Sequence, residues 1–227
     1  MANQHISVNP TGIPLEYCLL SDELENIHAH TNYVSFHKRE VIFRQHTPAS
    51  HILFVKSGLV KIYKEGRNKR NFILKIASAG EFIGLMSVFG GSMNQFSASA
   101  VDSSQIGYIE KSAFNSIMQK NGEFANGVAK YLSEEGLFIF ERLIGQSHKQ
   151  LPGRIADVIL YFSDTIFKKE EFEFPLTRRE LAELAGTTKE SFIRTLSEFK
   201  NDKIISLEGS RVMINSMKII RTLSELG

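Results

Sequence analysis

This sequence of 227 residues has a single cysteine, a small net charge and no long apolar run. Cys18 is the only cysteine, so the chain can form neither an internal disulfide nor a zinc site built on several cysteines. No apolar run approaches the ~20 residues of a membrane span, and the first residues lack the basic start and apolar core of a secretory signal. We therefore expect a cytoplasmic protein with no membrane contact.

A strong charge imbalance is also missing. The formal net charge is +2, and from residue 152 onward basic and acidic residues are equal in number. Binding to nucleic acid must therefore depend on where single charges are placed, and it should weaken as salt is added. The sequence also lacks a Gly-x-Ser-x-Gly nucleophile motif and a clustered His/Glu set on consecutive strand-like runs. We expect no enzymatic activity and no metal site.

The first half of the chain has the pattern of an antiparallel sheet structure. Residues 1–14 are predicted to be a flexible lead-in, and residues 15–122 a sensor domain of short strands with flanking helices. Turn signals containing Gly or Pro separate the strand-like runs, which is typical of a sandwich or barrel. The clearest runs are Val41–Phe43, His51–Val55, Leu59–Tyr63, Asn71–Ile76 and Gln105–Ile109.

Residues 123–151 are predicted to form one long helix that is apolar around most of its circumference. Such a helix must be covered on more than one side. A second copy of the chain is the economical cover, and burial by the chain's own two domains is the alternative. Two seam registers with a spacing of seven remain open, Leu132/Ile139 and Leu137/Ile144/Leu151. The candidate residues of the dimer helix are Val128, Tyr131, Leu132, Phe138, Ile139 and Leu143.

Residues 152–227 are predicted to be a C-terminal domain, with Leu151-Pro152-Gly153 as the hinge before it. Its central stretch, Leu176–Lys200, contains two short amphipathic segments. A Thr-x-x-Glu capping box starts the first near Thr177, and Gly186 ends it.

The second segment should start at Thr187 or Thr188, with Phe192, Leu196 and Phe199 on one buried face. On its own, the pair of segments is equally compatible with an ordinary helical hairpin. The helix and strand before it and the hairpin after it favour a winged helix-turn-helix that binds DNA.

The order of these parts resembles the CRP/FNR family of bacterial transcription regulators. The resemblance covers about residues 15–220 and rests on residues 38–66, GEFIGLMSVFGG at 80–91, the long helix, and residues 176–209. It implies an α+β fold: an N-terminal antiparallel β-roll like a cyclic-nucleotide-binding domain, a long dimerisation helix and a C-terminal winged helix-turn-helix. It further implies a homodimer that binds palindromic double-stranded DNA and contacts RNA polymerase.

The resemblance assigns base reading to Glu190 and Arg194. Arg can donate two hydrogen bonds to guanine, and Glu can accept one from cytosine, whereas a surface ion pair between the two residues is the alternative. Ile193 stands where FNR-like members usually have Ser, and an isoleucine there can contact a thymine methyl group. Thr177 and Arg178 are better placed for phosphates. The expected DNA contacts are Thr177, Arg178, Thr187, Thr188, Lys189, Glu190, Ser191 and Arg194.

The expected effector pocket departs from the members of the family that bind cyclic AMP. Leu85 stands where they have Glu, and Gln95 and Phe96 stand where they have Arg and Ser. The sequence has no Lys or Arg between Glu81 and Ile109, and a buried phosphate without a cationic partner is costly. These residues argue against cyclic AMP. The candidate pocket residues are Phe72, Gly84, Leu85, Met86, Gln95 and Phe96. The apolar group Met86, Phe89, Met93 and Phe96 could line such a pocket, but the pattern favours ordinary core for it.

An iron–sulfur cluster and a haem are two other sensing groups to consider, and the sequence excludes the first but not the second. A single cysteine cannot hold an iron–sulfur cluster. A haem-based or other small-ligand sensor whose output is directed to a protein remains the alternative, because several histidines lie in or near the sensor domain. These are His28, His30, His37, His46 and His51.

Overall fold

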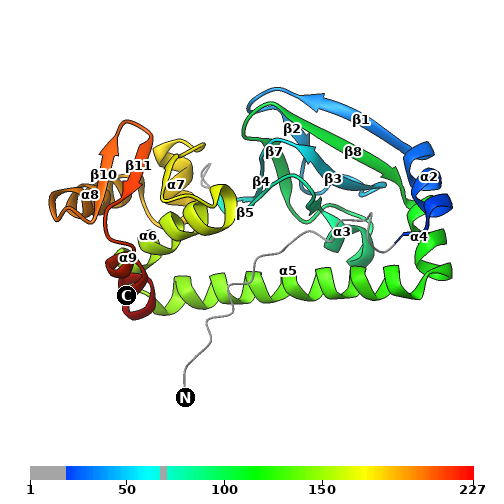
Figure 1. The fold of residues 1–227 in the computed structure, drawn as a ribbon. Coiled ribbons are helices and arrows are strands. Elements are labelled where there is room, and N and C mark those ends of the chain that lie inside the picture. Colours follow the sequence, from blue (N-terminus) through cyan, green and yellow to red (C-terminus); the bar gives the residue numbers. More distant parts are fainter. Residues whose placement is uncertain (1–18, 67–70) are drawn as a thin grey trace, which may run out of the picture. The chain divides into compact units, whose positions relative to one another are not determined.

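The computed structural model describes residues 19–66 and 71–227 (Figure 1). The lead-in predicted over residues 1–14 and Cys18 lie outside the described residues. The chain forms two compact units, one of residues 1–62 and 77–140 and one of residues 63–76 and 141–227. Within the described residues, no helix is long and apolar enough to cross a membrane.

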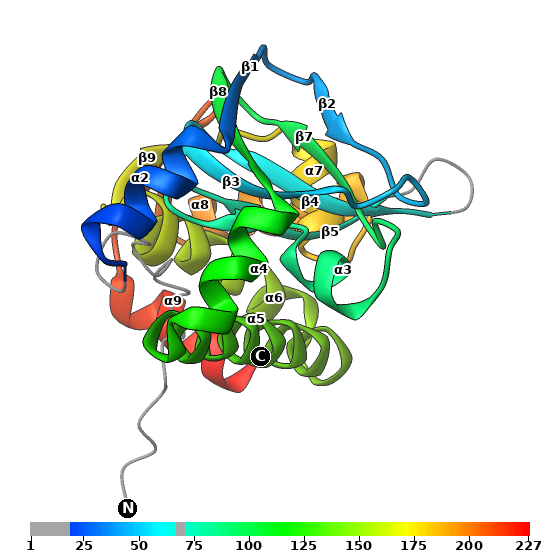
Figure 2. The same ribbon diagram turned by 90° about the vertical axis from the view of Figure 1, so that its right-hand side faces the viewer.

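The β-roll is built from two antiparallel sheets, and its strands lie in the first unit except for the end of β4 and nearly all of β5, which fall within residues 63–76 of the second. One sheet has the strand order β1-β8-β3-β6 and the other β2-β7-β4-β5. Figure 2 shows β1 beside β8, which in turn pairs with β3. The strands are β1 (Thr31–Phe36), β2 (Val41–Phe43), β3 (His51–Ser57), β4 (Val60–Glu65), β5 (Asn71–Ala77), β6 (Phe82–Ile83), β7 (Ser97–Ala100) and β8 (Ser104–Glu110). This arrangement confirms the predicted antiparallel β-roll.

The described part of the first unit contains the helices α2 (Ser21–Ala29), α3 (Leu85–Gly90) and α4 (Lys111–Lys120) and most of the long helix α5 (Gly122–His148). The first part of α5 packs into the core of the roll through Phe124, Val128 and Tyr131. The hydroxyl of Tyr131 accepts from the Phe82 amide and donates to the Phe82 carbonyl, both at 3.1 Å. A buried tyrosine hydroxyl needs such partners, so this pair fixes α5 on the roll.

Burial corrects part of the predicted dimer seam. Val128 and Tyr131 are 3% and 1% exposed inside their own unit, so the prediction that they line a seam with a second copy is wrong. Leu132 packs partly against the same core. Sequence periodicity identified these residues as a buried stripe but could not say which partner buries them.

The helical part of the second unit begins within α5, at Glu141, and continues with α6 (Leu151–Leu160). Gln150 is the N-cap of α6 and Pro152 lies in its first turn, a position that suits proline because no helical N–H bond is lost. The two helices therefore separate just before the predicted Leu151-Pro152-Gly153 hinge. Gly153 itself is buried, and a Cβ there would lie only 2.8 Å from the Cα of Gly227.

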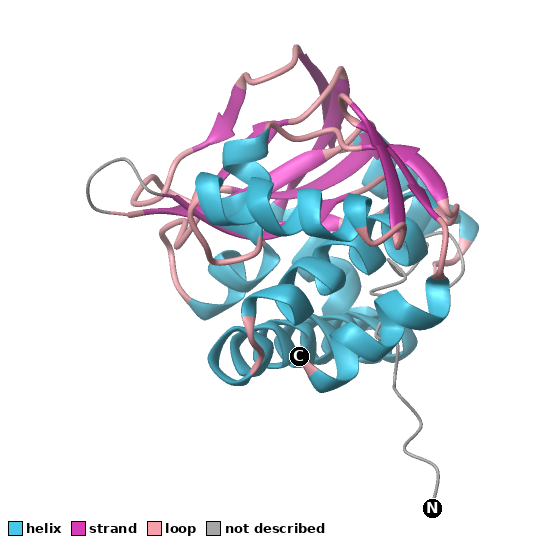
Figure 3. Ribbon diagram, turned by 90° about the vertical axis from the view of Figure 1, so that its left-hand side faces the viewer, coloured by secondary structure: helices cyan, strands magenta, loops and turns pink. Residues whose placement is uncertain are grey.

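A winged helix-turn-helix follows α6 and its π-helical extension η2 (Tyr161–Phe167), as predicted (Figure 3). Phe162, Phe167, Phe172 and Phe174 form an aromatic cluster in this domain, with contacting ring centroids 5.4–6.2 Å apart and Phe162 fully buried. The remaining elements are β9 (Glu171–Glu173), α7 (Arg178–Leu184), α8 (Lys189–Asn201), β10 (Ile205–Glu208), β11 (Arg211–Ile214) and α9 (Met217–Leu226). The strands form a sheet in the order β10-β11-β9, whose β10–β11 hairpin is the wing.

Candidate nucleic-acid interface

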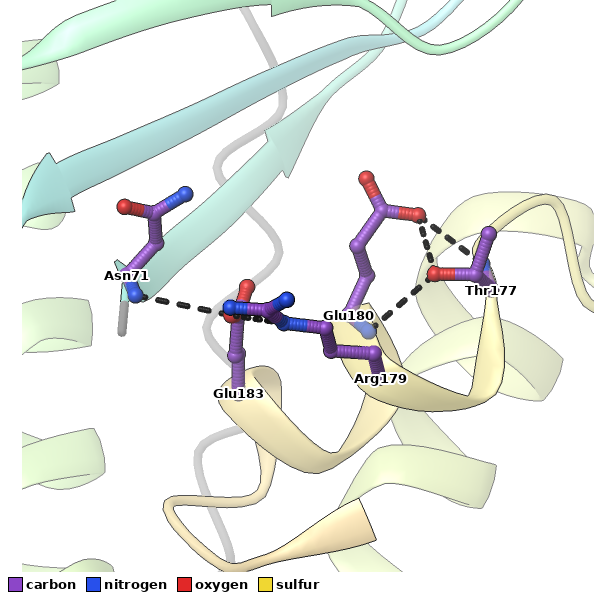
Figure 4. A network of polar contacts seen from close by, with 5 residues as sticks. All are labelled: Asn71, Thr177, Arg179, Glu180 and Glu183. Atoms are coloured by element: carbon purple, nitrogen blue, oxygen red, sulfur yellow. Dashed lines mark hydrogen bonds and ion pairs between the residues drawn. The ribbon is translucent and has the colours of Figure 1, made fainter. Parts of the chain in front are cut away.

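Helix α7 starts with the predicted capping box (Figure 4). The Thr177 hydroxyl accepts from the Glu180 amide at 3.3 Å, and the Glu180 carboxylate accepts from the Thr177 amide at 2.9 Å. Two amides that a helix start would leave without partners are thereby satisfied. The box fixes where α7 begins.

The turn between α7 and α8 is a Schellman motif around Gly186. The Thr187 amide donates to the Ala182 carbonyl at 2.9 Å and the Gly186 amide to the Glu183 carbonyl at 3.4 Å. Gly186 has a φ of +64°, in the left-handed region where a side chain is strained. This glycine lets Thr188, the N-cap of α8, stand only three positions after Ala185, the C-cap of α7.

Two arginines outside the helix pair hold this turn. Arg142 of α5 donates to the Leu184 carbonyl at 2.6 Å, and Arg154 of α6 donates to the Gly186 carbonyl at 2.9 Å. Cations at a helix C-terminus satisfy its free carbonyls and offset its dipole. Burial lowers the pKa of Arg142, while the charges of Tyr161 and Asp157 act in the opposite direction.

Neither arginine was among the predicted site residues. Arg142 carries a signal that could have found it, because it is a basic residue within the otherwise apolar run Leu137–Ile144 that contains only one other charge, Glu141. A buried basic residue in such a run needs an acceptor. Nothing in the sequence says that this acceptor lies in α7.

Helix α8 buries one face and leaves the other open. Thr188 is its N-cap, and Phe192, Leu196 and Phe199 are buried at 0–4% exposure, as the spacing predicted. The opposite face carries residues that are all exposed: Lys189, Glu190, Ile193, Arg194 and Ser197.

The charged side chains on this open face do not form ion pairs with one another. Within the described residues, no ion pair joins Glu190 to Arg194, nor does Lys189 have an acidic partner. Ser191 is half-buried, and its amide donates to the Thr188 hydroxyl at 3.2 Å. The base-reading residues expected from the sequence therefore share one accessible face of α8.

The side chain of Arg178 ties α7 to the wing. Its guanidinium donates to the Gly209 carbonyl in the wing turn and lies 5.6 Å from the centroid of the Phe174 ring. Burial lowers the pKa of Arg178. The predicted phosphate contact would have to use the remaining N–H groups of this side chain, since guanidinium has five.

The other end of α7 is anchored to β5 in the same unit. Glu183 accepts from the Asn71 amide at 3.4 Å and from Arg179 Nε at 3.3 Å, and Figure 4 shows the three groups converging. On the same strand, the Tyr161 hydroxyl accepts from the Ile76 amide at 2.9 Å and donates to the Ile76 carbonyl at 2.8 Å. The first contact holds the end of α7 against β5, and the second holds η2 against the same strand.

The candidate effector residues are only partly brought together. Gly84, with a φ of +76°, is the N-cap of α3, and the Gln95 amide reaches this helix by donating to the Ser87 hydroxyl at 3.1 Å. Leu85 is 3% exposed and lies in the hydrophobic core of the roll, and its place in an effector pocket stays a prediction. Met86 and Phe96 are half-buried in the first unit, and Phe72 belongs to the second.

Two histidines of the sensor region each have a hydrogen-bond partner close in sequence. His30 bonds the Asn26 carbonyl at 2.8 Å, and His51 bonds the Ser50 hydroxyl at 2.9 Å. Among the residues that the structure describes, no three His, Cys, Asp or Glu side chains cluster as metal ligands.

Two family models match the chain over most of its length. The cyclic nucleotide-binding domain matches residues 33–121, and the Crp-like helix-turn-helix domain matches residues 153–223. The first match concerns the β-roll and the second the unit that contains α7, α8 and the wing.

Relatives share this arrangement at low identity. The CRP-like cAMP-activated global transcriptional regulator of Mycobacterium tuberculosis is 23% identical over 186 residues, covering 80% of this chain and 83% of that protein. The anaerobic regulatory protein of Pasteurella multocida is 23% identical over 207 residues, covering 89% and 75%. The structure of FixK2 from Bradyrhizobium japonicum matches with a TM-score of 0.79 at 20% identity, covering 85% of this chain and 96% of that one. The structural likeness establishes the common fold.

Proposed function

This chain belongs to the CRP/FNR family of transcription regulators, and on that premise we propose that it binds a palindromic operator as a homodimer through α8. The observation that carries the proposal is the open face of α8, where Lys189, Glu190 and Arg194 are exposed. An α-helix with such a face fits the major groove, where Arg and Glu side chains distinguish base pairs.

Homodimer formation is supported by an apolar stripe on α5. Leu137, Phe140 and Ile144 follow the i, i+3, i+7 spacing of one helix face and are 55–65% exposed, and Leu143 beside them is 50% exposed. Leaving this much apolar surface in water is unfavourable, and a second copy of the same helix offers a matching surface. The stripe favours the Leu137/Ile144 register over the Leu132/Ile139 register.

The predicted seam residues Phe138 and Ile139 are half-buried, whereas Leu143 is exposed beside the stripe. In the proposed dimer, Leu143 lies in the seam and the other two lie at its edge. A dimer of this kind presents two α8 helices to half-sites about one helical turn apart, ~10 base pairs.

The sensor domain, in this proposal, responds to an effector other than cyclic AMP. Leu85 is part of the core, and the exposed Gln95 side chain donates to the Met93 carbonyl at 3.3 Å. Neither side chain supplies the charge that a cyclic phosphate and its ribose need. The identity of any cofactor stays open, with haem as a candidate. An absorption spectrum of the purified protein would reveal a haem, in which case a histidine of the sensor domain becomes the candidate ligand.

The proposal also includes where the protein acts and which second partner it contacts. The protein acts in the bacterial cytoplasm, where the chromosome is, and its DNA-bound dimer contacts RNA polymerase. No residue is assigned to that contact.

Selection of binding sequences from a random DNA library tests the proposal. Enrichment of a palindrome with two half-sites about one helical turn apart is the expected result. Binding that shows no sequence preference and disappears at moderate salt would overturn it in favour of a sensor with protein-directed output.

Sedimentation of the Phe140→Glu variant tests the dimer separately. Placing a carboxylate in the apolar stripe should shift the protein to monomer and weaken operator binding. Gln119→Glu, which adds the same charge at an exposed position of α4, is the matched control and should remain dimeric. An unchanged dimer in Phe140→Glu would place the interface elsewhere.

A further inference from the structure

Ile193 is apolar, whereas the other residues on the open face of α8 are charged or polar. It is 39% exposed, and it is the only large exposed hydrophobic residue in α8, a helix that the structure describes completely. The neighbouring Phe192 and Leu196, in contrast, are 0% and 1% exposed in the core. A substantial part of Ile193 is therefore left outside the packing of the winged helix.

A single exposed isoleucine needs no explanation on an ordinary surface. The position of Ile193 makes it informative. Residues three and four apart are neighbours on a helix, so Ile193 lies beside Glu190 and Lys189 and directly precedes Arg194. An apolar branched side chain thus stands among the groups assigned to the major groove, and it would be buried once the groove is occupied.

The only apolar group that a base edge presents in the major groove is the C5-methyl group of thymine. Cytosine lacks this methyl group, and adenine and guanine present hydrogen-bonding atoms that an isoleucine would leave without partners. The neighbouring charged residues cannot make the apolar contact. We propose that Ile193 is a specificity-determining residue that reads a thymine methyl group in each half-site.

This inference rests on the proposed DNA-binding function, and it adds a base contact of a different chemical kind. Arg194 and Glu190 read hydrogen-bonding groups, whereas Ile193 reads a methyl group. Loss of the contact should therefore change which pyrimidine is accepted at one position and leave the rest of the operator preference intact.

Replacing thymine by deoxyuridine in the selected operator tests the contact directly, because this change removes the methyl group and keeps every hydrogen-bonding atom. We expect one thymine position in the half-site to respond. Changing it in a single half-site should weaken binding by about fourfold, the value for burying one methyl-sized group, and changing it in both half-sites should weaken binding by about fifteenfold. Fluorescence anisotropy at fixed salt measures the effect.

The same titrations with Ile193→Ala complete a double-mutant cycle. The variant should bind the thymine and deoxyuridine operators with affinities within about twofold, since the methyl group has lost its partner. Ser197→Ala, one helical turn further along the same face, is the control and should retain the full deoxyuridine effect. Alanine favours the helix, and thermal unfolding checks that both variants are folded.

A second substitution sharpens the result. 5-Methylcytosine in place of cytosine at the same position supplies the methyl group on a different base. The parent protein should bind the 5-methylcytosine operator more tightly than the cytosine operator, whereas Ile193→Ala should bind the two operators equally.

The outcomes separate the two proposals. A deoxyuridine effect that persists undiminished in Ile193→Ala, or that is absent at every thymine, overturns the role of Ile193 while specific DNA binding stands. Failure to select any operator overturns the proposed function itself.

Discussion

The two helices of the helix-turn-helix use their polar side chains in opposite ways. On α7, Thr177 and Glu180 cap the helix, Arg178 reaches the wing, and Arg179 and Glu183 form an ion pair at 3.3 Å. On α8, the side chains of Lys189, Glu190 and Arg194 have no such ion pairs within the described residues. The difference teaches that charge on α7 positions the motif, whereas charge on α8 is available to a ligand.

The largest expected effect comes from removing a free cation of α8. Arg194→Ala should weaken specific operator binding by roughly 2–6 kcal/mol over two half-sites, because each bidentate Arg–guanine pair contributes roughly 1–3 kcal/mol. Titration of the selected operator measures the loss.

Arg179→Ala is the matched control for that prediction, because Arg179 is also exposed but pairs with Glu183 on α7. Its effect on binding should be small. Equal losses in both variants would contradict the division between a positioning helix and a reading helix.

The next effect concerns the arginine that fixes the turn. Arg142→Ala leaves the Leu184 carbonyl without its donor at 2.6 Å, and loss of a hydrogen bond to a charged group costs roughly 1.5–3 kcal/mol in unfolding free energy. Denaturant titration measures this change, and the folded variant should keep its operator preference.

Lys130→Ala serves as the control for Arg142, since the Lys130 side chain is 75% exposed on the same helix. Its unfolding free energy should stay close to that of the parent protein. If Arg142→Ala altered the selected operator sequence and left stability unchanged, Arg142 would be a reading residue and the comparison would fail.

How far the sequence predicts these features depends on how local their causes are. The capping box at Thr177, the turn at Gly186 and the buried face of α8 each depend on residues close in sequence, and all three were predicted correctly. Strand β7 (Ser97–Ala100) was missed because its sequence Ser-Ala-Ser-Ala has neither β-branched nor aromatic residues, although all four are buried. Its pairing partners, and not its own composition, make it a strand.

The same reasoning explains the candidate residues that were misplaced or missed. The apolar pattern of α5 showed that Val128 and Tyr131 are buried, but both the roll and a second chain could have covered them. The acceptors of Arg142 and Tyr161 lie in β5 and α7, far away in sequence. Long-range contacts of single side chains leave no periodic signal.

A smaller effect is expected at the cap of α7. Thr177→Ala removes the hydroxyl that accepts from the Glu180 amide, and loss of such a cap costs about 1 kcal/mol. Thermal unfolding should show a modest fall in stability, and Thr177→Ser, which keeps the hydroxyl, should show almost none. A large loss of operator binding at unchanged stability would instead assign Thr177 to the DNA, as the sequence had predicted.

The smallest effect should come from Lys189, at the start of α8. If this lysine neutralises a phosphate, Lys189→Ala should weaken binding to all sequences alike, and the slope of log affinity against log salt should fall by about 0.9 for each half-site. Lys200→Ala, exposed near the far end of α8, provides a comparison of equal charge. A change in the preferred bases with an unaltered salt slope would instead make Lys189 a third hydrogen-bonding reader beside Glu190 and Arg194, because only a base contact discriminates between sequences.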